Sequence, residues 1–299
     1  MTGHPERLQN RRRPSISEIE RRIGEHQKDF WHLWDTSQPA HLYHYTSLDA
    51  AASIIKSGCF WATDIRYMND NTEQHYAWCI ALDVLAGRCD FLSKEIYYIL
   101  EQAGGIPGLE DEVFRYAVCF CGRRDSINQW KEYTRKGNGV ALSIPFSALR
   151  QKAEALDCAL IRAVYDVDCQ ATAVRSFMDH VLVSWEEFRP DTKAAQDQFL
   201  GYIGGGLIQL MFRFKNPDYR REDEWRALLI EGPHPLGLKH LKRNGKLIPY
   251  MEWSFRPDYF DGIMTGPEPY GADETRVKEI LAGSPLESVS VSRSTWKFT

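Results

Sequence analysis

The alternation of apolar and polar residues predicts a strand, a short helix and a second strand between His41 and Asp70. The stretch "LYHY" has a strand pattern, "SLDAAASIIKSG" has helical spacing, and "CFWATD" has a strand pattern again. Ser47 is a suitable N-cap and Gly58 a suitable left-handed stop, so the helix is expected between them. The polar cluster from Tyr43 to Ser47 then lies where a strand meets a helix N-terminus, a place that favours anions such as phosphate.

Further along the chain, helical and strand patterns follow one another irregularly. "TEQHYAWCIALDVLAG" and "SKEIYYILEQAGG" have helical periodicity, and residues 171–214 are predicted to be mainly helical with an interruption at Gly204-Gly205-Gly206. Strand patterns occur in "YAVCFCG", "GVALSI", "CALIRAVYD", "EWRALLI" and "KLIPYMEW". Because strands and helices do not alternate regularly, the expected class is α+β, with a mixed, mostly antiparallel central sheet and helical insertions.

The same patterns predict how the chain is divided. Residues 1–38 are expected to form a mobile basic tail followed by a helix whose capping box begins at Ser17. Residues 39–299 are expected to form a single, catalytic-like α+β domain with helical insertions near 73–113 and 171–214. No repeat and no low-complexity linker interrupts this second part.

Composition excludes several classes of protein. The formal net charge of -4 argues against a protein that mainly coats nucleic acid, although one basic groove is compatible with it. No segment approaches the roughly 18 apolar residues of a membrane span, and the first residues lack a signal-peptide pattern. We therefore expect a soluble, cytoplasmic protein with no membrane partner. The seven cysteines stand mostly in apolar runs without a C-x-x-C pair, which is typical of reduced core residues rather than of a zinc site.

The polar cluster before the first predicted helix leaves two interpretations of His44. In an extended strand, His44 points away from Tyr43 and Tyr45, so the three rings cannot all face one pocket. His44 is either a pocket residue or a core histidine bonded to a backbone carbonyl.

A second cluster places two aromatic residues on one helical face. Trp130 and Tyr133 in "SINQWKEYTRKGNG" are three residues apart and therefore share that face. They form either a contact between helix and sheet or an aromatic wall for a flat ring, with Asn128 or Ser126 supplying hydrogen bonds.

A third cluster places acidic residues before an apolar strand. In "YRREDEWRALLI", Glu222, Glu224 and Arg226 alternate and share one face if the strand begins early. Glu224 either pairs with Arg226 or with a nearby arginine, or it binds a sugar hydroxyl beside a scissile glycosidic bond. The P-loop, dinucleotide-fold, nucleophile-elbow and zincin motifs are absent from the sequence.

Together these blocks resemble the bacterial family of domain of unknown function (DUF) 2971. The resemblance rests on "LYHYTSLDAAASIIKSGCFWATDIRYMND", "CFCGRRDSINQWKEYTRKGNGVALSI", "YRREDEWRALLI" and "FDGIMTGPEP", whose order and spacing cover most of residues 41–299. The family name carries no activity. The opening block is also similar to the first strand and helix of ADP-ribosyltransferase-like proteins, where a strand ending in His-x-Thr precedes a short helix and a glycine.

The ADP-ribosyltransferase resemblance implies a split-sheet core and a His, Tyr, Glu signature, which His44, Tyr133 and Glu224 match in type and order. It implies that these three residues are catalytic. His44 would hold NAD together with Thr46, and Tyr133 would stack on nicotinamide. Glu224 would bind the 2-hydroxyl of the nicotinamide ribose and stabilise the cationic transition state.

The same resemblance implies a wider set of NAD-binding residues. Arg66 would meet the pyrophosphate or else remain a surface charge, Trp130 competes with Tyr133 for stacking, and Glu222 competes with Glu224. NAD is expected as a substrate, and no metal is expected. The complete set around the three catalytic candidates is Tyr43, Thr46, Ser47, Arg66, Trp130 and Glu222.

The function implied is that of an NAD-dependent ADP-ribosyltransferase-like enzyme with a nucleic acid or protein acceptor. Such an enzyme would act as a toxin or phage-defence effector, with an antitoxin or other regulatory partner. Two alternatives stay open. One is a non-catalytic module that binds a nucleotide or a partner protein. The other is a carboxylate-based hydrolase or nuclease that uses Glu222, Glu224 and His44 with a divalent ion.

Overall fold

The computed structural model describes most of the chain, and the chain divides into two compact units. The sheet unit takes its described residues from 37–74, 108–165 and 213–299, and the helical unit from 75–107 and 166–212. The expected basic tail and N-terminal helix lie outside the described residues, apart from Arg21 and Gln38. The residues described are 21, 38–68, 73–103, 114–134, 137–155, 158–189, 192–231, 237–243, 245–269, 271–272 and 274–297.

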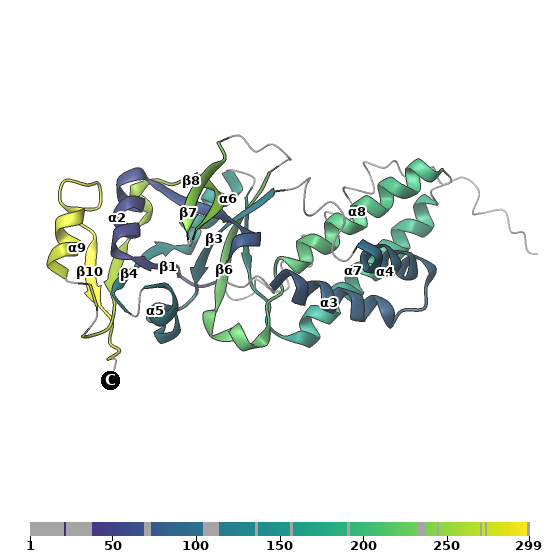
Figure 1. Ribbon diagram of the computed structural model, residues 1–299, viewed down its shortest axis with the longest axis horizontal. Helices are drawn as coiled ribbons and strands as arrows, with labels where there is room; N and C mark the ends of the chain where they lie inside the picture. The colour runs from purple at the N-terminus through teal and green to yellow at the C-terminus, as the bar shows by residue number, and fades with distance from the viewer. Residues whose placement is uncertain are drawn as a thin grey trace, which may run out of the picture. The chain divides into compact units, whose positions relative to one another are not determined.

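The described part of the sheet unit contains a ten-stranded sheet (Figure 1). Its main path runs β10-β9-β4-β1-β3-β2-β8-β7, while β6 joins at β3 and β5 joins at β6. β9 and β10 are parallel and the other pairs are antiparallel, which confirms the expected mixed, mostly antiparallel sheet. The strands are β1 (His41–Ser47), β2 (Cys59–Asp64), β3 (Phe114–Cys121), β4 (Gly139–Pro145), β5 (Ala159–Arg162), β6 (Glu224–Glu231), β7 (Lys239–Arg243), β8 (Lys246–Ser254), β9 (Gly262–Thr265) and β10 (Ser290–Arg293).

The segment from β1 through α2 (Leu48–Ser57) to β2 folds as its pattern predicts. The Ser47 hydroxyl caps the helix, because it accepts a hydrogen bond from the Ala50 N–H at 3.3 Å. Gly58 ends the helix with a φ of 64°, and its N–H donates to the Ile54 carbonyl at 2.9 Å. One N–H at the helix start is therefore satisfied by the chain's own cap.

Strand β3 is the point at which the sheet divides. Along one edge it pairs with β6 over its whole length, ending with Cys121 opposite Glu224. Along the other edge it pairs with β2 at Tyr116 and Ala117, and then with β1 at Cys121. The C-terminal end of β3 consequently lies between β1 and β6, and side chains from both strands gather around it.

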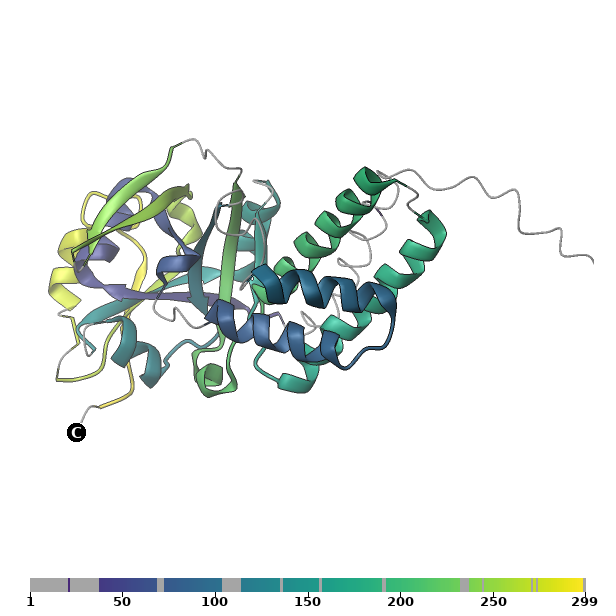
Figure 2. The same ribbon diagram turned by 45° about the vertical axis from the view of Figure 1, so that its right-hand side comes forward.

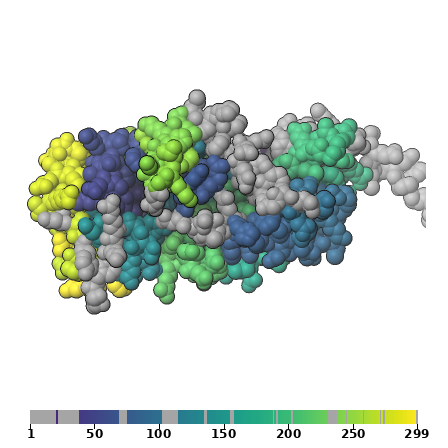
Figure 3. All heavy atoms as spheres, viewed as in Figure 1, coloured from purple at the N-terminus to yellow at the C-terminus, as the bar shows by residue number. Residues whose placement is uncertain are grey.

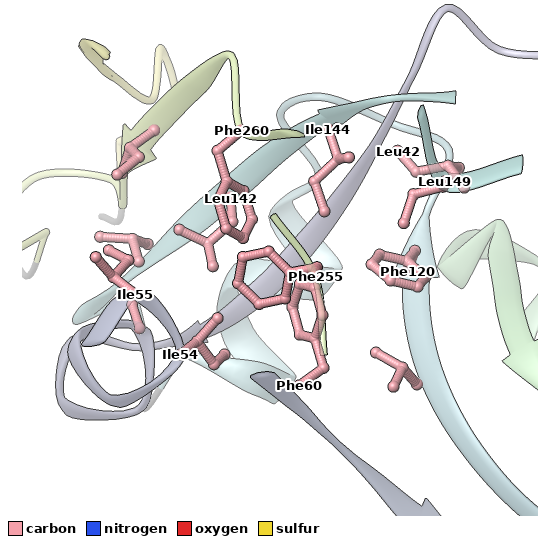
Figure 4. Close-up of a cluster of buried hydrophobic side chains, with 14 of the residues drawn as sticks. Leu42, Ile54, Ile55, Phe60, Phe120, Leu142, Ile144, Leu149, Phe255 and Phe260 are labelled. Carbon is pink, nitrogen blue, oxygen red and sulfur yellow. The ribbon is translucent and has the colours of Figure 1, made fainter. Parts of the chain in front are cut away.

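Apolar side chains fill one face of the sheet, here called the core face (Figure 4). Phe60 lies at its centre, with ring centroids 4.8 Å from Phe255 and 5.6 Å from Phe120. Helices α2, α6 (Phe146–Ala155) and α9 (Glu274–Leu281) add buried side chains to this face. The side chains labelled in Figure 4 are Leu42, Ile54, Ile55, Phe60, Phe120, Leu142, Ile144, Leu149, Phe255 and Phe260.

The opposite face of the sheet, here called the polar face, carries a smaller apolar cluster and helix α5 (Ile127–Tyr133). Directly opposite residues of paired strands share a face, so Tyr43, Cys121 and Glu224 all belong to the polar face. Phe120 and Trp225, one residue further along, belong to the core face. The members of the smaller cluster are Tyr45, Cys121, Trp130, Ala141 and Met264, with Tyr43 and Tyr133 packed against them.

At the surface of the sheet unit, the C-terminal segment lies beside α2. Figure 3 shows α9 and the strand after it, in yellow, beside α2, in purple. An exposed ion pair joins the two helices, with 3.8 Å between Arg276 Nη2 and Asp49 Oδ1. Two elements of this unit, α6 and β7, are absent from the prediction; β7 is a mostly charged strand at the edge of the sheet.

The helical unit consists, over its described residues, of α3 (Glu73–Ala86), α4 (Phe91–Ala103), α7 (Val167–Phe188) and α8 (Lys193–Met211), as Figure 2 shows. Tyr76 of α3 donates to Gln170 of α7 at 2.8 Å. Trp185 of α7 meets Phe199 of α8 edge-to-face, with centroids 5.1 Å apart. The two predicted insertions thus pack on each other as a compact unit.

Helix α8 also corrects the interruption expected at Gly204-Gly205-Gly206, because the helix is continuous there. Ile203, Leu207 and Leu210 are buried at helical spacing on either side of the glycines. Their burial offsets the helix propensity that glycine lacks, about 1 kcal/mol per residue relative to alanine. No helix in the described ranges is long and apolar enough to cross a membrane.

Candidate functional site

A buried cluster of charges stands at the start of β6 on the polar face. Lys215 Nζ donates to Glu222 Oε2 at 2.5 Å and also to Glu224 Oε2. Arg226 Nε donates to Glu224 Oε1 at 2.7 Å. Lys215, Glu224 and Arg226 are each at most 5% exposed, so the interactions are made out of contact with bulk water. The Glu224–Arg226 pair confirms the ion pair that the spacing of these residues predicts.

The backbone at Asp223 explains how two carboxylates reach one lysine. The short helix η2 (Pro217–Glu222) ends at Glu222, and β6 begins at Glu224, later than the early start considered from the sequence. Between them Asp223 has a φ of 44°, in the left-handed region that Asp tolerates better than most residues. Its carbonyl accepts from the Gly122 N–H at 2.8 Å, and its carboxylate accepts from Arg162 at 3.0 Å. These contacts hold the turn in place.

The charge of Glu224 is maintained despite its burial. Burial disfavours the carboxylate, but the charges of Arg226 and Lys215 and their hydrogen bonds outweigh it, so the pKa of Glu224 lies below its ordinary value. Cys119, on the same face of β3, donates its thiol to Glu224, and burial together with that negative charge raises the pKa of Cys119. The Glu224 N–H donates to the Tyr165 hydroxyl at 3.0 Å. The Glu224 carboxylate therefore accepts from Lys215, Arg226 and Cys119, while its backbone N–H is satisfied by Tyr165.

Tyr133 lies beside this cluster. Burial raises the pKa of the Tyr133 phenol, and the negative charges of Glu222 and Glu224 raise it further. Helix α5 is tied to the same turn, because Gln129 Nε2 donates to the Glu222 carbonyl at 3.2 Å. The structure thus brings together Tyr133, Glu222 and Glu224, three of the residues that the sequence singles out.

A clamp at Asp125 anchors α5 on the polar face. Asp125 Oδ1 accepts from Trp130 Nε1 and from the Ser294 hydroxyl, both at 2.7 Å, and its Oδ2 accepts from the Thr295 N–H at 2.9 Å. Burial opposes the charge of Asp125, but the hydrogen bonds from Trp130, Thr295 and Ser294 keep its pKa below the ordinary value. Trp130 is fully buried and meets Tyr45 edge-to-face at 4.8 Å. Trp130 therefore makes the helix-to-sheet contact, and Tyr133 is the more exposed of the two rings.

His44 lies on the other face of the sheet. Its Nδ1 is 2.9 Å from the Cys119 carbonyl, and its ring lies 5.0 Å from that of Phe60 and 5.9 Å from that of Phe120. Burial lowers the pKa of His44, so the neutral ring donates to the carbonyl. The structure therefore realises the core interpretation of His44. It does not bring His44 to Tyr133 and Glu224, because His44 points to the core face and they lie on the polar face.

The remaining NAD-binding candidates are spread over the sheet unit. Thr46 points to the same face as His44, and the Ser47 hydroxyl is the cap of α2. Arg66 is bound by the buried carboxylate of Asp64, with Nη2 2.7 Å from Oδ2, at the far end of β3 from Cys121. Tyr43 does lie on the polar face, and burial raises the pKa of its phenol.

Sequence reasoning did not identify Lys215, Cys119, Tyr165 or Asp125 as members of this site. Lys215 had a signal, because the stretch "FRFKN" alternates aromatic and cationic residues from Phe212 to Lys215, and a cation in such a stretch needs a partner. In the part of the chain that the structure describes, no group of three or more His, Cys, Asp and Glu side chains is arranged to hold a metal ion.

Comparisons with known proteins give one match. Residues 129–227 match the family model described as "Protein of unknown function (DUF2971)", and this segment includes Tyr133, Lys215, Glu222 and Glu224. Comparisons with curated proteins and with solved structures give no match.

Proposed function

We propose that the protein is an NAD-dependent ADP-ribosyltransferase-like enzyme. Residues 129–227 match a family of unknown function, so the proposal rests on the chain's own residues. One observation carries the proposal: Tyr133 and the carboxylates of Glu222 and Glu224 gather around Lys215 on one face of the sheet. The division of the sheet at β3 is compatible with the split-sheet core of such enzymes.

The chemistry of the cluster suits the cleavage of a glycosidic bond. When the bond between nicotinamide and ribose breaks, its electron pair leaves with the pyridine nitrogen, and positive charge develops on the sugar. A carboxylate beside the sugar stabilises this charge. The Glu222 side chain is 15% exposed and that of Glu224 is 6% exposed, so Glu222 is the carboxylate better placed to meet a ligand. Tyr133 would stack on the nicotinamide ring.

The proposal divides the roles among the predicted residues differently from the His, Tyr, Glu signature. Glu224 acts as a positioning residue, since it holds Lys215 and Arg226. His44 has a structural role, because its ring packs between Phe60 and Phe120 on the core face. The acceptor would be a nucleic acid or a protein. A toxin or phage-defence role, with an antitoxin or regulatory partner, belongs to the same proposal.

The test is the release of nicotinamide from NAD in the presence of nucleic acid and protein acceptors, with the acceptor mass as a second readout. Glu222→Gln is expected to lower turnover about 100-fold or more, because it removes charge stabilisation in the transition state. His44→Phe is the control on the core face and is expected to retain turnover once folding is verified. No release from folded protein contradicts the proposal. Cleavage of nucleic acid that EDTA abolishes would instead indicate the carboxylate-based hydrolase or nuclease.

A non-catalytic nucleotide-binding module is a second candidate, and one observation favours it. Both carboxylate oxygens of Glu224 are already engaged by cations, as in a structural ion pair. Such a module would bind NAD or ATP in calorimetry without turnover. Its affinity would not change in Glu224→Gln, whereas the proposed enzyme loses activity in that variant.

A further inference from the structure

The two ends of the main sheet path differ in how they resist pairing with another chain. At one end, β7 has the sequence "KHLKR", in which every side chain except the leucine is basic. Charged side chains along an edge strand discourage pairing with a further strand. At the other end, β10 continues the uncharged stretch "SVSVS" from Ser288 to Ser292. Figure 1 shows β10 and α9, in yellow, at this end of the sheet.

The outer edge of β10 presents backbone groups that no strand takes up. The Ser294 N–H donates to the Thr265 carbonyl at 2.9 Å, so the backbone of Ser294 faces β9. Because backbone groups alternate between the two edges along a strand, and β10 runs parallel to β9, the N–H and C=O of Ser292 face β9 as well. Those of Val291 and Arg293 therefore face outward. In the described part of the chain, no strand pairs with β10 on that side.

The side chains at this edge suit a second copy of the same strand. Val289 and Val291 pack against the core cluster but are only partly buried, so apolar surface remains at the edge. Arg293 is the single charged residue of β10, and its guanidinium already contacts Glu268 at 2.9 Å and Glu274 at 3.2 Å in the same chain. Its charge is thus balanced within the chain and does not require an acidic partner.

An antiparallel pair centred on Val291 matches apolar with apolar and hydroxyl with hydroxyl residues. Val291 then lies opposite the partner's Val291, and Ser290 lies opposite the partner's Ser292. The Val291 backbones pair with each other, and each Arg293 N–H meets the partner's Val289 carbonyl, which gives about four hydrogen bonds in all. The Val289 N–H is already used, because it donates within its own chain at 3.0 Å. The two arginines do not lie opposite each other in this register.

We propose that β10 is a homodimer interface, at which it pairs antiparallel with β10 of a second copy about a two-fold axis at Val291. Two-fold dimers are the commonest oligomers of soluble proteins, and each copy presents the same surface to the other. The charge pattern decides for a second copy, because an identical strand meets no like charge directly opposite, whereas a strongly charged partner finds no counter-charge here. The inference is independent of the proposed enzymatic function.

The test is sedimentation velocity of the full chain over a wide range of protein concentrations. Wild-type protein is expected to shift from the chain mass of 34.6 kDa to twice that mass as the concentration rises. Ser290→Lys combined with Ser292→Lys places lysines directly opposite each other in both halves of the pair. This double variant is expected to raise the dissociation constant about tenfold or more, with folding verified by circular dichroism.

A charge-swapped variant and a matched control make the test specific for this register. Ser290→Glu combined with Ser292→Glu is expected to weaken the dimer similarly, and equimolar mixing with the lysine double variant is expected to restore it. Ser53→Lys on α2 with Ser254→Lys on β8 adds the same two charges at exposed positions and is expected to change the dissociation constant less than about threefold.

Three results would overturn the proposal. One is a wild-type chain that stays monomeric at every concentration. Another is a dimer that the lysine double variant weakens no more than the control does, because the interface would then lie elsewhere. The third is a mixture of folded lysine and glutamate double variants that stays monomeric.

Discussion

The two faces of the central sheet bury polar groups in opposite ways. On the core face, His44 is kept neutral among aromatic rings and satisfied by one backbone carbonyl. On the polar face, Glu224 keeps its negative charge, because the positive charges of Lys215 and Arg226 stabilise the carboxylate. Burial alone does not distinguish a structural residue from a candidate site residue. The partners do, since the polar face holds a carboxylate among charged partners, whereas the core face holds a neutral ring bonded to a backbone carbonyl.

Strand β3 serves both faces at once. Phe120 packs into the core face, while Cys119 and Cys121 point to the polar face and meet Glu224 and Tyr43. The same strand also supplies the carbonyl that satisfies His44. Substitutions on either face therefore act on a shared backbone. Their effects on the free energy of unfolding compare the two faces.

The largest expected effect is the loss of the buried cation. Lys215→Met leaves Glu222 and Glu224 facing each other, partly desolvated and without the lysine between them. We expect the free energy of unfolding to fall by about 3–5 kcal/mol, the usual cost of breaking a buried ion pair from one side. Urea denaturation followed by tryptophan fluorescence measures it.

The control for this substitution is an exposed pair in the same unit. Arg256→Met removes the ion pair with Asp258, whose atoms Nη2 and Oδ2 are 2.6 Å apart at the surface, and is expected to cost less than about 0.5 kcal/mol. Similar costs for Arg256→Met and Lys215→Met would mean that water screens the polar-face cluster.

A smaller effect with a defined pH dependence is expected for Glu224→Gln. At pH 7 the variant is expected to lose about 2 kcal/mol, because charged hydrogen bonds to Lys215 and Arg226 are lost. The pKa of Glu224 is lower in the folded than in the unfolded state, so its contribution is complete above about pH 4.3 and is lost as the pH falls further. Denaturation midpoints of wild type and variant should therefore converge in acid. A constant difference down to pH 3 would contradict this assignment.

The smallest effect is expected on the core face. The pKa of His44 is lower in the folded than in the unfolded state, so folding stability falls as the pH drops below about 6.5, by at most about 1.4 kcal/mol per pH unit. His44→Phe keeps an aromatic ring, costs about 1 kcal/mol at pH 7 for the lost hydrogen bond, and removes this dependence. Thermal melting between pH 7 and pH 5 measures this pH dependence of stability, with His240→Gln on the exposed strand β7 as control. A wild-type slope retained in His44→Phe would assign the dependence to another group.

The sequence predicts those parts of the fold that depend on neighbouring residues. The cap at Ser47 and the stop at Gly58 are local signals, and α2 lies between them. The pairing of β3 with β1, β2 and β6 is not predictable in this way, because its partners are distant along the chain. The packing of the two helical insertions on each other depends on long-range contacts in the same manner.

The candidate site likewise has features that neighbouring residues predict and features that depend on long-range contacts. The alternation of Glu224 and Arg226 predicts their ion pair, and the spacing of Trp130 and Tyr133 predicts their common helix face. The meeting of both carboxylates at Lys215 depends on one left-handed residue, Asp223, that no pattern indicates. Alternation in β1 placed His44 opposite its tyrosine neighbours, but which of these two faces becomes the core depends on the whole sheet.

The clamp at Asp125 has a consequence for synthesis on the ribosome. Asp125 precedes helix α5, and its partner Ser294 follows it by 169 residues. A nascent chain that has already produced Tyr133, Glu222 and Glu224 still lacks the Ser294 and Thr295 donors that complete the anchor of α5. The candidate site thus reaches its final geometry only after translation has passed residue 295, which delays any activity until nearly all of the described chain has been made.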